Sequence, residues 1–347
     1  MTKPQPKAIL VLPRLRVQNA NAISSPLTHG FPSITAFMGL MWALERKLAQ
    51  EQIALHLQAV GVICHHHQEQ ATKGFVRTFN QARNPVDEHG NTAAIVQEGR
   101  IHLDITLVFA VAEKRTAGES ACLGNEDRMQ KWADDAGAIL AQMRVAGGTL
   151  LPSRPVPGKR RRPWMAVLPE NSQERADQFR RWRYQWLPGF ALVGCDHLLS
   201  GRLAKLRETK PEATLLDAWL HAARFNHEPV PPKEGEAAPA DGKQLWNDPW
   251  RGEGSGWIVP IPVGYAALEP HRPPHPAGTV QNARDMSTPL RFVESVYSFG
   301  RWISPHRLEQ PEDLWWYSET DQTKDLYRCR NDHATVSEDI GNWNSRL

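Results

Sequence analysis

The stretch KAILVLPRLRVQNANAISSPLTHGFPSITAFMGLMWALERKLAQ, residues 7–50, contains a strand, a polar loop and a helix in succession. Residues 7–17 are rich in branched aliphatic side chains, which favours a strand. Residues 18–33 are small, polar or turn-forming, and large apolar residues then recur at helical spacing over 34–50. Ser33 is a suitable cap for that helix. The stretch therefore predicts the first half of a layered α+β unit.

The downstream pattern completes the order β-α-β-β-α-β. Further strands are predicted over residues 53–64, 101–112 and 149–151, and a second helix over 126–144. This order is that of the ferredoxin-like unit found in RNA-recognition domains. We therefore predict an α+β fold with a ferredoxin-like (RRM-like) core over 1–152.

A long polar insertion, residues 66–99, separates the second and third predicted strands. Insertions of this length in compact domains are usually functional or disordered. Extended stretches on either side of a turn predict a projecting β-ribbon, or thumb. If 76–83 is extended, alternate side chains share one face: Arg77, Phe79, Gln81 and Arg83. Such a face suits single-stranded nucleic acid; the alternative is a solvated arm with Phe79 packed on the body.

Residues 153–347 are predicted to form a larger, irregular second α+β part packed on the core. A basic aromatic helix is predicted over 175–186 and a strand over 256–265. Residues 227–245 consist largely of Pro, Glu, Gly and Ala, which predicts a disordered surface loop. The secondary structure of 280–307 is left open.

Composition limits the class of protein. No run of 18 or more apolar residues occurs, so no membrane-spanning helix is predicted, and the N-terminus does not fit a secretory signal. Four widely spaced cysteines without a CxxC pair fit a cytoplasmic protein and exclude a zinc finger. The net charge is only +3, but 29 Arg outnumber 12 Lys. Arginine binds phosphate through two bonds and stacks on bases, so the excess reflects either RNA binding or codon bias.

No pattern predicts an enzyme, a cofactor or a metal site. His65-His66-His67 lies near Glu69, but successive residues of a strand point to opposite faces and rarely bind one ion. Cys195-Asp196-His197 lacks an accompanying oxyanion signature. Motifs for phosphate loops, dinucleotide folds, zinc proteases and serine hydrolases do not occur.

The polar loop after the first strand is a stronger candidate for binding. Its Asn and Gln side chains can bond base edges, and its Ser hydroxyls can donate to phosphate. The loop also leads into a helix N-terminus, which favours anions. A plain polar connection remains the alternative.

Segments spread along the whole chain carry a family resemblance. They are LPRLRVQNANAISSPLTHGFPS (12–33), ARNP with TAAIVQEGR (82–100), MRVAGGTLLP (143–152), LPGFALV (187–193), VPIPVGYAAL (259–268), NARDMSTPLRFVE (282–294) and WISPHR (302–307). Together they make the chain similar to the type I-F CRISPR-associated Csy family, in particular the Cas5-like subunit of its crRNA-guided surveillance (Csy, or Cascade) complex.

The resemblance implies a thumb-bearing subunit that holds the 5′ handle of the CRISPR guide RNA together with the large subunit. It also implies contact with the adjacent backbone subunit, support of target DNA binding at the end of the complex, and no nuclease role in antiviral defence. Two departures limit it. The third strand lacks the paired aromatics of ordinary RNA-recognition domains, and residues 113–125, 153–175 and 227–256 match less strongly.

The predicted RNA-binding residues form three groups. Those of the thumb are Arg77, Phe79, Asn80 and Arg83. Those of the polar loop are Gln18, Asn19, Asn21, Ser24 and Ser25. Those near the C-terminus are Asn282, Arg284, Arg291, His306 and Arg307.

Two other functions stay open. A metal-independent endoribonuclease that processes the CRISPR RNA precursor would need a general base beside a phosphate clamp, for which His29 or His306 is available. A protein scaffold without RNA contact would leave the arginine excess unexplained.

Overall fold

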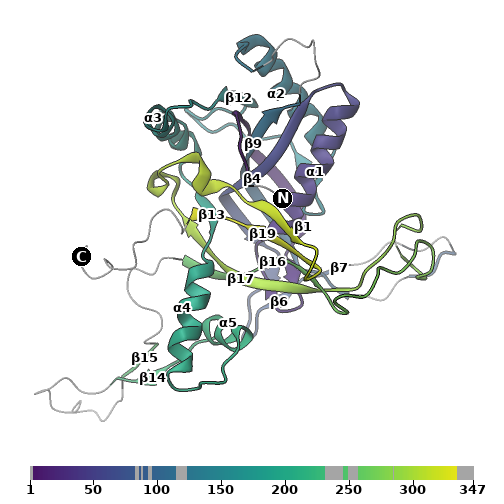
Figure 1. The fold of residues 1–347 in the computed structure, drawn as a ribbon, viewed down its shortest axis with the longest axis vertical. Coiled ribbons are helices and arrows are strands. Elements are labelled where there is room, and N and C mark those ends of the chain that lie inside the picture. The colour runs from purple at the N-terminus through teal and green to yellow at the C-terminus, as the bar shows by residue number, and fades with distance from the viewer. Residues whose placement is uncertain are drawn as a thin grey trace, which may run out of the picture.

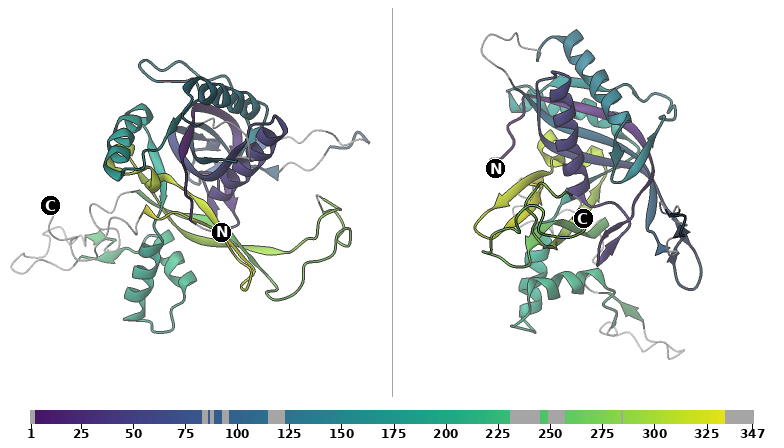
Figure 2. Two further views of the ribbon diagram at one scale, coloured as in Figure 1. Left: turned by 45° about the horizontal axis from the view of Figure 1, so that its top comes forward. Right: turned by 90° about the vertical axis from the view of Figure 1, so that its right-hand side faces the viewer.

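The computed structural model describes residues 3–82, 86, 89–92, 96–114, 123–230, 245–248, 257–283 and 285–333. They form a mixed α+β fold around an 11-stranded antiparallel sheet, which curls on itself (Figures 1 and 2). The strand order is β10-β11-β1-β9-β4-β13-β17-β16-β19-β18, and β12 also pairs with β1. None of the helices in these residues has the length and apolar content needed to cross a membrane.

The N-terminal half of the sheet follows the predicted order closely. Its elements are β1 (Ala8–Asn21), α1 (Ile34–Gln50), β4 (Leu55–Glu69), β9 (Arg100–Glu113), α2 (Glu126–Ala141), β10 (Arg144–Val145) and β11 (Gly148–Leu151). The bounds predicted for α1 are confirmed, and Ser33 caps it through its side chain. The second helix ends three residues earlier than predicted. Residues 144–145 instead pair with β11 through a turn in which Ala146 and Gly147 have positive φ.

Apolar side chains are buried on both faces of this half-sheet. On one face, Leu10 and Leu12 pack with Phe37 and Leu44 of α1 in the largest core cluster. On the other, Ile9 and its neighbours pack against α3 (Ser172–Arg183), η1 (Tyr184–Trp186) and η3 (Pro311–Leu314). Each fully buried aliphatic side chain contributes about 1.5–3 kcal/mol relative to an exposed one. The doubly covered part of the sheet is therefore a rigid base for the strand ends that extend beyond it.

Two β-bulges divide β1 into three segments. Relative to β9, an extra residue is inserted between Leu12 and Leu15 and another between Val17 and Ala20. Arg14 and Asn19 occupy these positions with φ of 53° and 57°. Each bulge reverses the alternation of side chains. The core-facing residues are therefore even-numbered up to Leu12, odd-numbered at Val17 and even-numbered again at Ala20. Arg16 and Gln18 consequently lie on the face away from α1 and α2.

The C-terminal half continues the same sheet. Its strands are β12 (Trp164–Val167), β13 (Phe190–Gly194), β16 (Trp257–Ala267), β17 (Val293–Ile303), β18 (Tyr317–Asp321) and β19 (Leu326–Arg330). The short strand β13 pairs with β4 on one side and β17 on the other, so one sheet runs through both halves of the chain. The undecided region 280–307 contains β17. The described residues of 268–292, which exclude residue 284, form a projecting arm between β16 and β17 (Figure 1, right).

A small helical pair extends from β13. It comprises α4 (Asp196–Arg207) and α5 (Leu215–Ala223), followed by the ladder β14 (Glu228–Pro229) with β15 (Trp246–Asn247). The basic aromatic helix predicted over 175–186 is formed by α3 and η1. Most of the loop predicted to be disordered, residues 231–244, lies outside the described residues.

The predicted ribbon has a different local structure from the one expected. Bends at 74–76 precede two short strands, and residues 83–85 lie outside the described residues. Strand β5 (Ala71–Thr72) pairs with β6 (Thr78–Phe79), and β7 (Gln81–Ala82) pairs with β8 (Val96–Gln97). Each strand finds a partner nearby, and Gly74 lies within the bends between β5 and β6. The shared face predicted for residues 77, 79, 81 and 83 stays a prediction, because residue 83 lies outside the described residues.

Candidate nucleic-acid interface

A polar hollow lies where β1, β4 and β9 extend beyond the doubly covered core. Its volume is about 260 Å³. Its polar lining consists of Arg16, Gln18, His66, Gln68, His102, Asp104 and Arg154. The strand register explains the grouping, because Asp104 is opposite both Arg16 and His66, and His102 is opposite Gln68. Alternate residues of three neighbouring strands thus meet on one face.

Positive charge dominates this hollow. Asp104 is its one carboxylate among the lining residues, and burial raises the pKa of that group. The positive charges of Arg14, His66, Arg16 and Arg154 act in the opposite direction. Arg14 is only 5% exposed, and its guanidinium lies 4.0 Å from the Asp104 carboxylate. Arg14 therefore balances Asp104, which leaves the charges of Arg16 and Arg154 for a ligand.

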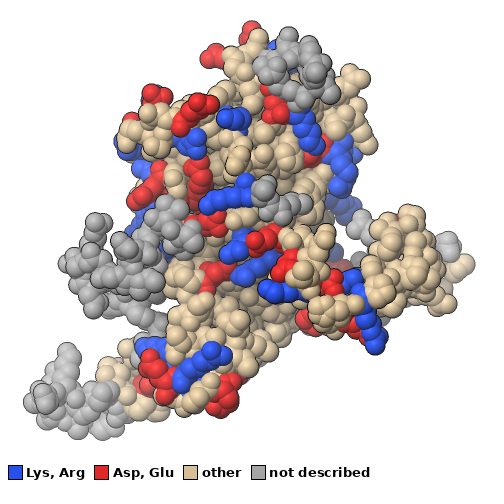
Figure 3. Space-filling view, in the orientation of Figure 1, with Lys and Arg blue, Asp and Glu red and all other residues tan. Residues whose placement is uncertain are grey.

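The two outer arginines are available to an anion. Arg16 donates one bond to the Pro152 carbonyl at 3.2 Å and is half-buried, whereas Arg154 is exposed. Neither forms a salt bridge with another described residue. Basic and acidic side chains intermingle on the face drawn in Figure 3, in keeping with the net charge of +3. The local arrangement in the hollow, rather than the total charge, is thus what favours a phosphate.

Most polar atoms of the predicted loop hold the loop itself together. The Asn19 backbone N–H donates to His102 Nδ1 at 3.1 Å, and the Asn21 side chain bonds both backbone groups of Ile23. The hydroxyls of Ser24 and Ser25 each lie 2.7 Å from Thr28 Oγ1, beside the ladder of β2 (Ile23–Ser25) with β3 (Thr28–His29). Of this group, Gln18 lines the hollow, while Ser24 lines the larger cavity described below.

A cluster around Glu69 fastens the base of the thumb. The Glu69 side chain is 7% exposed, and its carboxylate lies 2.5 Å from Arg77 Nη2 and 2.9 Å from His29 Nδ1. Phe79 is half-buried with its ring edge-on to His29 at 5.5 Å. Asn80 Oδ1 accepts from the Thr72 hydroxyl at 3.0 Å. Arg77 thus keeps part of its guanidinium exposed, whereas Phe79 is partly covered; Arg83 lies outside the described residues.

The three adjacent histidines all border the larger cavity described below, but each ring has different neighbours. His65 lies between Thr106 Oγ1 and the Pro188 carbonyl, at 2.8 and 2.7 Å, and burial lowers its pKa to about 4. His66 lines the polar hollow, and the His67 ring lies 6.3 Å from that of Trp257. Among the residues that the structure describes, no group of three His, Cys, Asp or Glu side chains is arranged to hold a metal ion.

Comparison with known proteins identifies the family to which the chain belongs. The model described as CRISPR-associated protein (Cas_Csy2) matches residues 10–329 of the chain. The chain belongs to the Csy2 family of CRISPR-associated proteins. It is 42% identical over 337 residues to the "CRISPR-associated protein Csy2" of Pseudomonas aeruginosa (strain UCBPP-PA14). The match covers 94% of this chain and 96% of that relative. The resemblance seen in the sequence is thus confirmed at the level of the Csy family, and the matched span includes the polar hollow.

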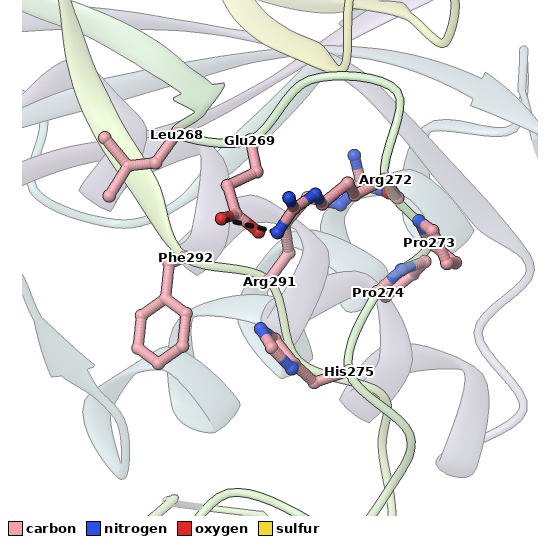
Figure 4. A pocket seen from close by; sticks show the side chains of 8 residues that line it. All are labelled: Leu268, Glu269, Arg272, Pro273, Pro274, His275, Arg291 and Phe292. Carbon is pink, nitrogen blue, oxygen red and sulfur yellow. Dashed lines mark hydrogen bonds and ion pairs between the residues drawn. The ribbon is translucent and has the colours of Figure 1, made fainter.

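The described residues of the third predicted RNA-binding group do not lie together in this Csy2-family chain. Asn282 lies in the projecting arm, with φ of 58°. Arg291 lines a pocket of about 210 Å³ at the base of the arm, where Glu269 and Arg272 reach toward each other (Figure 4). Arg284 lies outside the described residues. His306 and Arg307 belong instead to η2 (Pro305–Arg307), which packs against α3 and η1.

Arg291 is engaged within the fold. Its guanidinium lies 2.5 Å from the Asp325 carboxylate and donates to the Arg272 carbonyl at 2.8 Å. His306 Nδ1 lies 2.8 Å from the Ser304 hydroxyl. These contacts give both side chains structural partners.

Sequence reasoning overlooked the main components of the hollow. Arg16, Arg154 and His102 were not singled out, and His66 was considered only as a metal ligand, although the Csy2-family chain brings the four together. A signal was present at Pro13-Arg14, because a proline in a strand often marks a bulge that reverses side-chain alternation. Arg154 had no local signal, since only the pairing of β11 with β1 brings its neighbourhood to the hollow.

Proposed function

We propose that this chain is a non-catalytic, cytoplasmic crRNA-binding subunit of a type I-F CRISPR surveillance complex. In this role it is the Cas5-like subunit, which holds the 5′ handle of the guide RNA together with the large subunit. The observation that carries the proposal is the hollow lined by Arg16, Arg154 and Gln18 in a member of the Csy2 family.

The chemistry of the hollow suits a polynucleotide. Guanidinium groups bind phosphate oxygens in pairs, which positions a nucleic-acid backbone without reading its sequence. Amide side chains such as Gln18 and Gln68 bond base edges in unpaired segments. A single-stranded handle exposes both its phosphates and the edges of its bases, whereas the bases of a duplex are largely enclosed by pairing.

The proposed core is ferredoxin-like. Support comes from the chain order β1-α1-β4-β9-α2-β11 and from antiparallel pairing of β11 with β1, β1 with β9 and β9 with β4. Both helices also contribute to the same core cluster. This arrangement is common to many functions, so it supports the proposal only in combination with the hollow and the family.

The proposed protein partners are the large subunit and the adjacent backbone subunit, with target DNA bound at the end of the complex. Support comes from the projecting arm 268–292, whose apolar side chains Leu268, Met286 and Phe292 are exposed. Its Arg291–Asp325 ion pair and the bridge between residues 275 and 290 give it internal order. An ordered arm with exposed apolar groups is suited to contacting another subunit.

A salt titration of RNA binding tests the proposal. The full-length chain is mixed with labelled handle RNA, without metal, and compared with the double variant Arg16→Ala/Arg154→Ala. The matched control is Arg46→Ala/Arg128→Ala, which removes two exposed arginines from α1 and α2. For single strands each lost phosphate contact lowers the slope of log K against log salt by about 0.7, so the double variant should lose about 1.4.

The outcomes separate the functions. Weaker binding with a smaller slope in the hollow variant alone supports an RNA-binding subunit. Equal behaviour of both variants refutes this site. Cleavage of precursor RNA without metal would instead support the endoribonuclease, for which His29 beside Glu69 and Arg77 is the available arrangement. No RNA binding by the wild-type chain or by its complex would leave a protein scaffold.

A further inference from the structure

A second, larger cavity adjoins the polar hollow and has a different chemistry. Its volume is about 630 Å³. Residues 65–69, the terminal stretch of β4, border it, and His66 and Gln68 line both spaces. This stretch pairs with β9 along one edge, but its other edge lies beyond β13, which pairs with β4 only at Ile63 and Cys64. The two spaces are therefore consecutive parts of one surface around the end of β4.

The floor and one wall of the cavity are apolar and aromatic. Leu192, Val259 and Ile261 form part of the lining. Trp302 lies edge-on to Phe31 at 4.8 Å, and Phe31 stacks on Phe37 of the core at 5.7 Å. This wall is thus fixed to the interior by a continuous series of rings, and its shape does not depend on a ligand.

Two large rings at the mouth are half exposed. Trp257 is 52% exposed and Phe190 is 47% exposed, with their centroids 6.5 Å apart. The centroid of the His67 ring also lies 6.3 Å from that of Trp257. Exposed aromatic groups clustered in this way on a soluble chain generally mark a binding surface. A flat ring such as Trp257 offers stacking to any base, because every base has a π-face.

The rim of the cavity favours a negatively charged ligand. Lys73, Arg77 and His29 line it, and the Glu69 carboxylate is already bound to the last two. Lys73 forms no salt bridge with another described residue and is exposed. An apolar floor with a cationic rim suits a nucleotide better than a neutral aliphatic side chain. The base can pack on the floor, and the phosphate can bind the positive charges of the rim.

We propose that this cavity receives one unpaired base of the bound RNA, stacked on Trp257, while neighbouring phosphates lie at the rim and in the polar hollow. The inference rests on the proposed RNA-binding function and adds the path of the strand around residues 65–69. It assigns a separate role to each space: the hollow binds backbone phosphates, and the cavity binds a base.

Abasic scanning of the RNA tests this assignment. The full-length chain is titrated with handle RNAs in which one nucleotide at a time lacks its base. In the wild-type protein one abasic position should lower affinity on the order of tenfold, the usual cost of a lost stack. Trp257→Ala should bind intact RNA with a similar loss of affinity. In that variant, removing the base at the same position should lower the affinity little further. Trp257→Phe should retain most of the affinity, and the salt slope should be unchanged because no phosphate contact is lost.

The control is Trp246→Ala, which removes another exposed tryptophan, in β15. Thermal midpoints of all variants establish that each is folded. If abasic positions act equally on wild-type protein and Trp257→Ala while Arg16 and Arg154 still govern the salt slope, the base site is refuted and the proposed function stands. If Trp257→Ala leaves RNA affinity intact but reduces co-purification of a partner subunit, the cavity is a protein contact and the inference is wrong. Loss of RNA binding in every form, wild type included, refutes both.

Discussion

Mild acid should destabilise the fold through His65. The side chain is half-buried, and its ring nitrogens lie within hydrogen-bond distance of Thr106 Oγ1 and the Pro188 carbonyl. Because a carbonyl only accepts, Nδ1 carries the proton and Nε2 accepts from the threonine hydroxyl. Burial lowers the pKa of the ring from 6.5 to about 4, and the charges of Arg14 and Lys159 act in the same direction. The folded protein thus holds His65 neutral where the unfolded chain would protonate it.

The sign and size of the effect follow from linkage. The unfolded chain takes up a proton as the pH falls through about 6.5, and the folded chain takes it up only near pH 4. The stabilisation is therefore complete above pH 6.5, declines between 6.5 and 4, and declines no further below 4. At about 1.4 kcal/mol per pKa unit, the total loss is roughly 3 kcal/mol.

The measurement compares wild-type protein with His65→Gln, whose amide can donate to Pro188 and accept from Thr106 but does not titrate. Urea unfolding is followed by tryptophan fluorescence at several pH values from 7.5 to about 4.5. As the pH drops, the free energy of unfolding should fall more steeply for the wild type than for His65→Gln. The two curves of free energy against pH should therefore converge or cross. His67→Gln, exposed on the same strand, should run parallel to the wild type. Parallel curves for wild type and His65→Gln would show that the His65 ring does not control the acid response.

Two further predictions concern the second half of the chain. A Cβ on Gly264 would lie 2.1 Å from the Tyr327 carbonyl oxygen, so Gly264→Ala should cost about 1–3 kcal/mol in thermal or urea unfolding. Gly201→Ala in α4, which meets nothing within 4 Å, should be neutral or slightly stabilising, and equal effects of the two would contradict the reasoning. Replacing residues 231–243 by a short Gly-Ser linker should leave the thermal midpoint and co-purification with partner subunits unchanged, because β14 and β15 pair across the ends of that segment. Failed assembly of a stable variant would show that the segment contacts a partner.

The parts of the fold that depend on local pattern were predictable. The helix α1 has an apolar stripe, a Ser33 cap and a polar preceding loop, all within one short stretch. The strands β4 and β9 are long and aliphatic, and their existence followed from composition.

The parts that depend on distant pairing were not predictable. Strand β13 has only five residues, yet it joins β4 to β17, which is more than a hundred residues away in sequence. The polar hollow requires the register of β1 with β9 and β11, and the aromatic cavity requires Trp257 to lie beside Phe190 and His67. No window of sequence contains these combinations. The short ladders in the described part of the thumb were not predictable either, because which strands pair there depends on the partner strand rather than on local propensity.

The two bulges in β1 let this strand change length without changing which side chains face the core. Loss of Arg14 would leave residue 13 opposite residue 106, so Leu15 would stay opposite Ile105 and Arg16 would keep its face. Loss of Asn19 would likewise leave Ala20 opposite Ile101 and in the core. Straightening the strand at its full length would instead turn Arg16 and Gln18 into the core beneath the helices. Homologous strands can therefore gain or lose a residue at either bulge independently, whereas an insertion elsewhere in the strand needs a new bulge to absorb it.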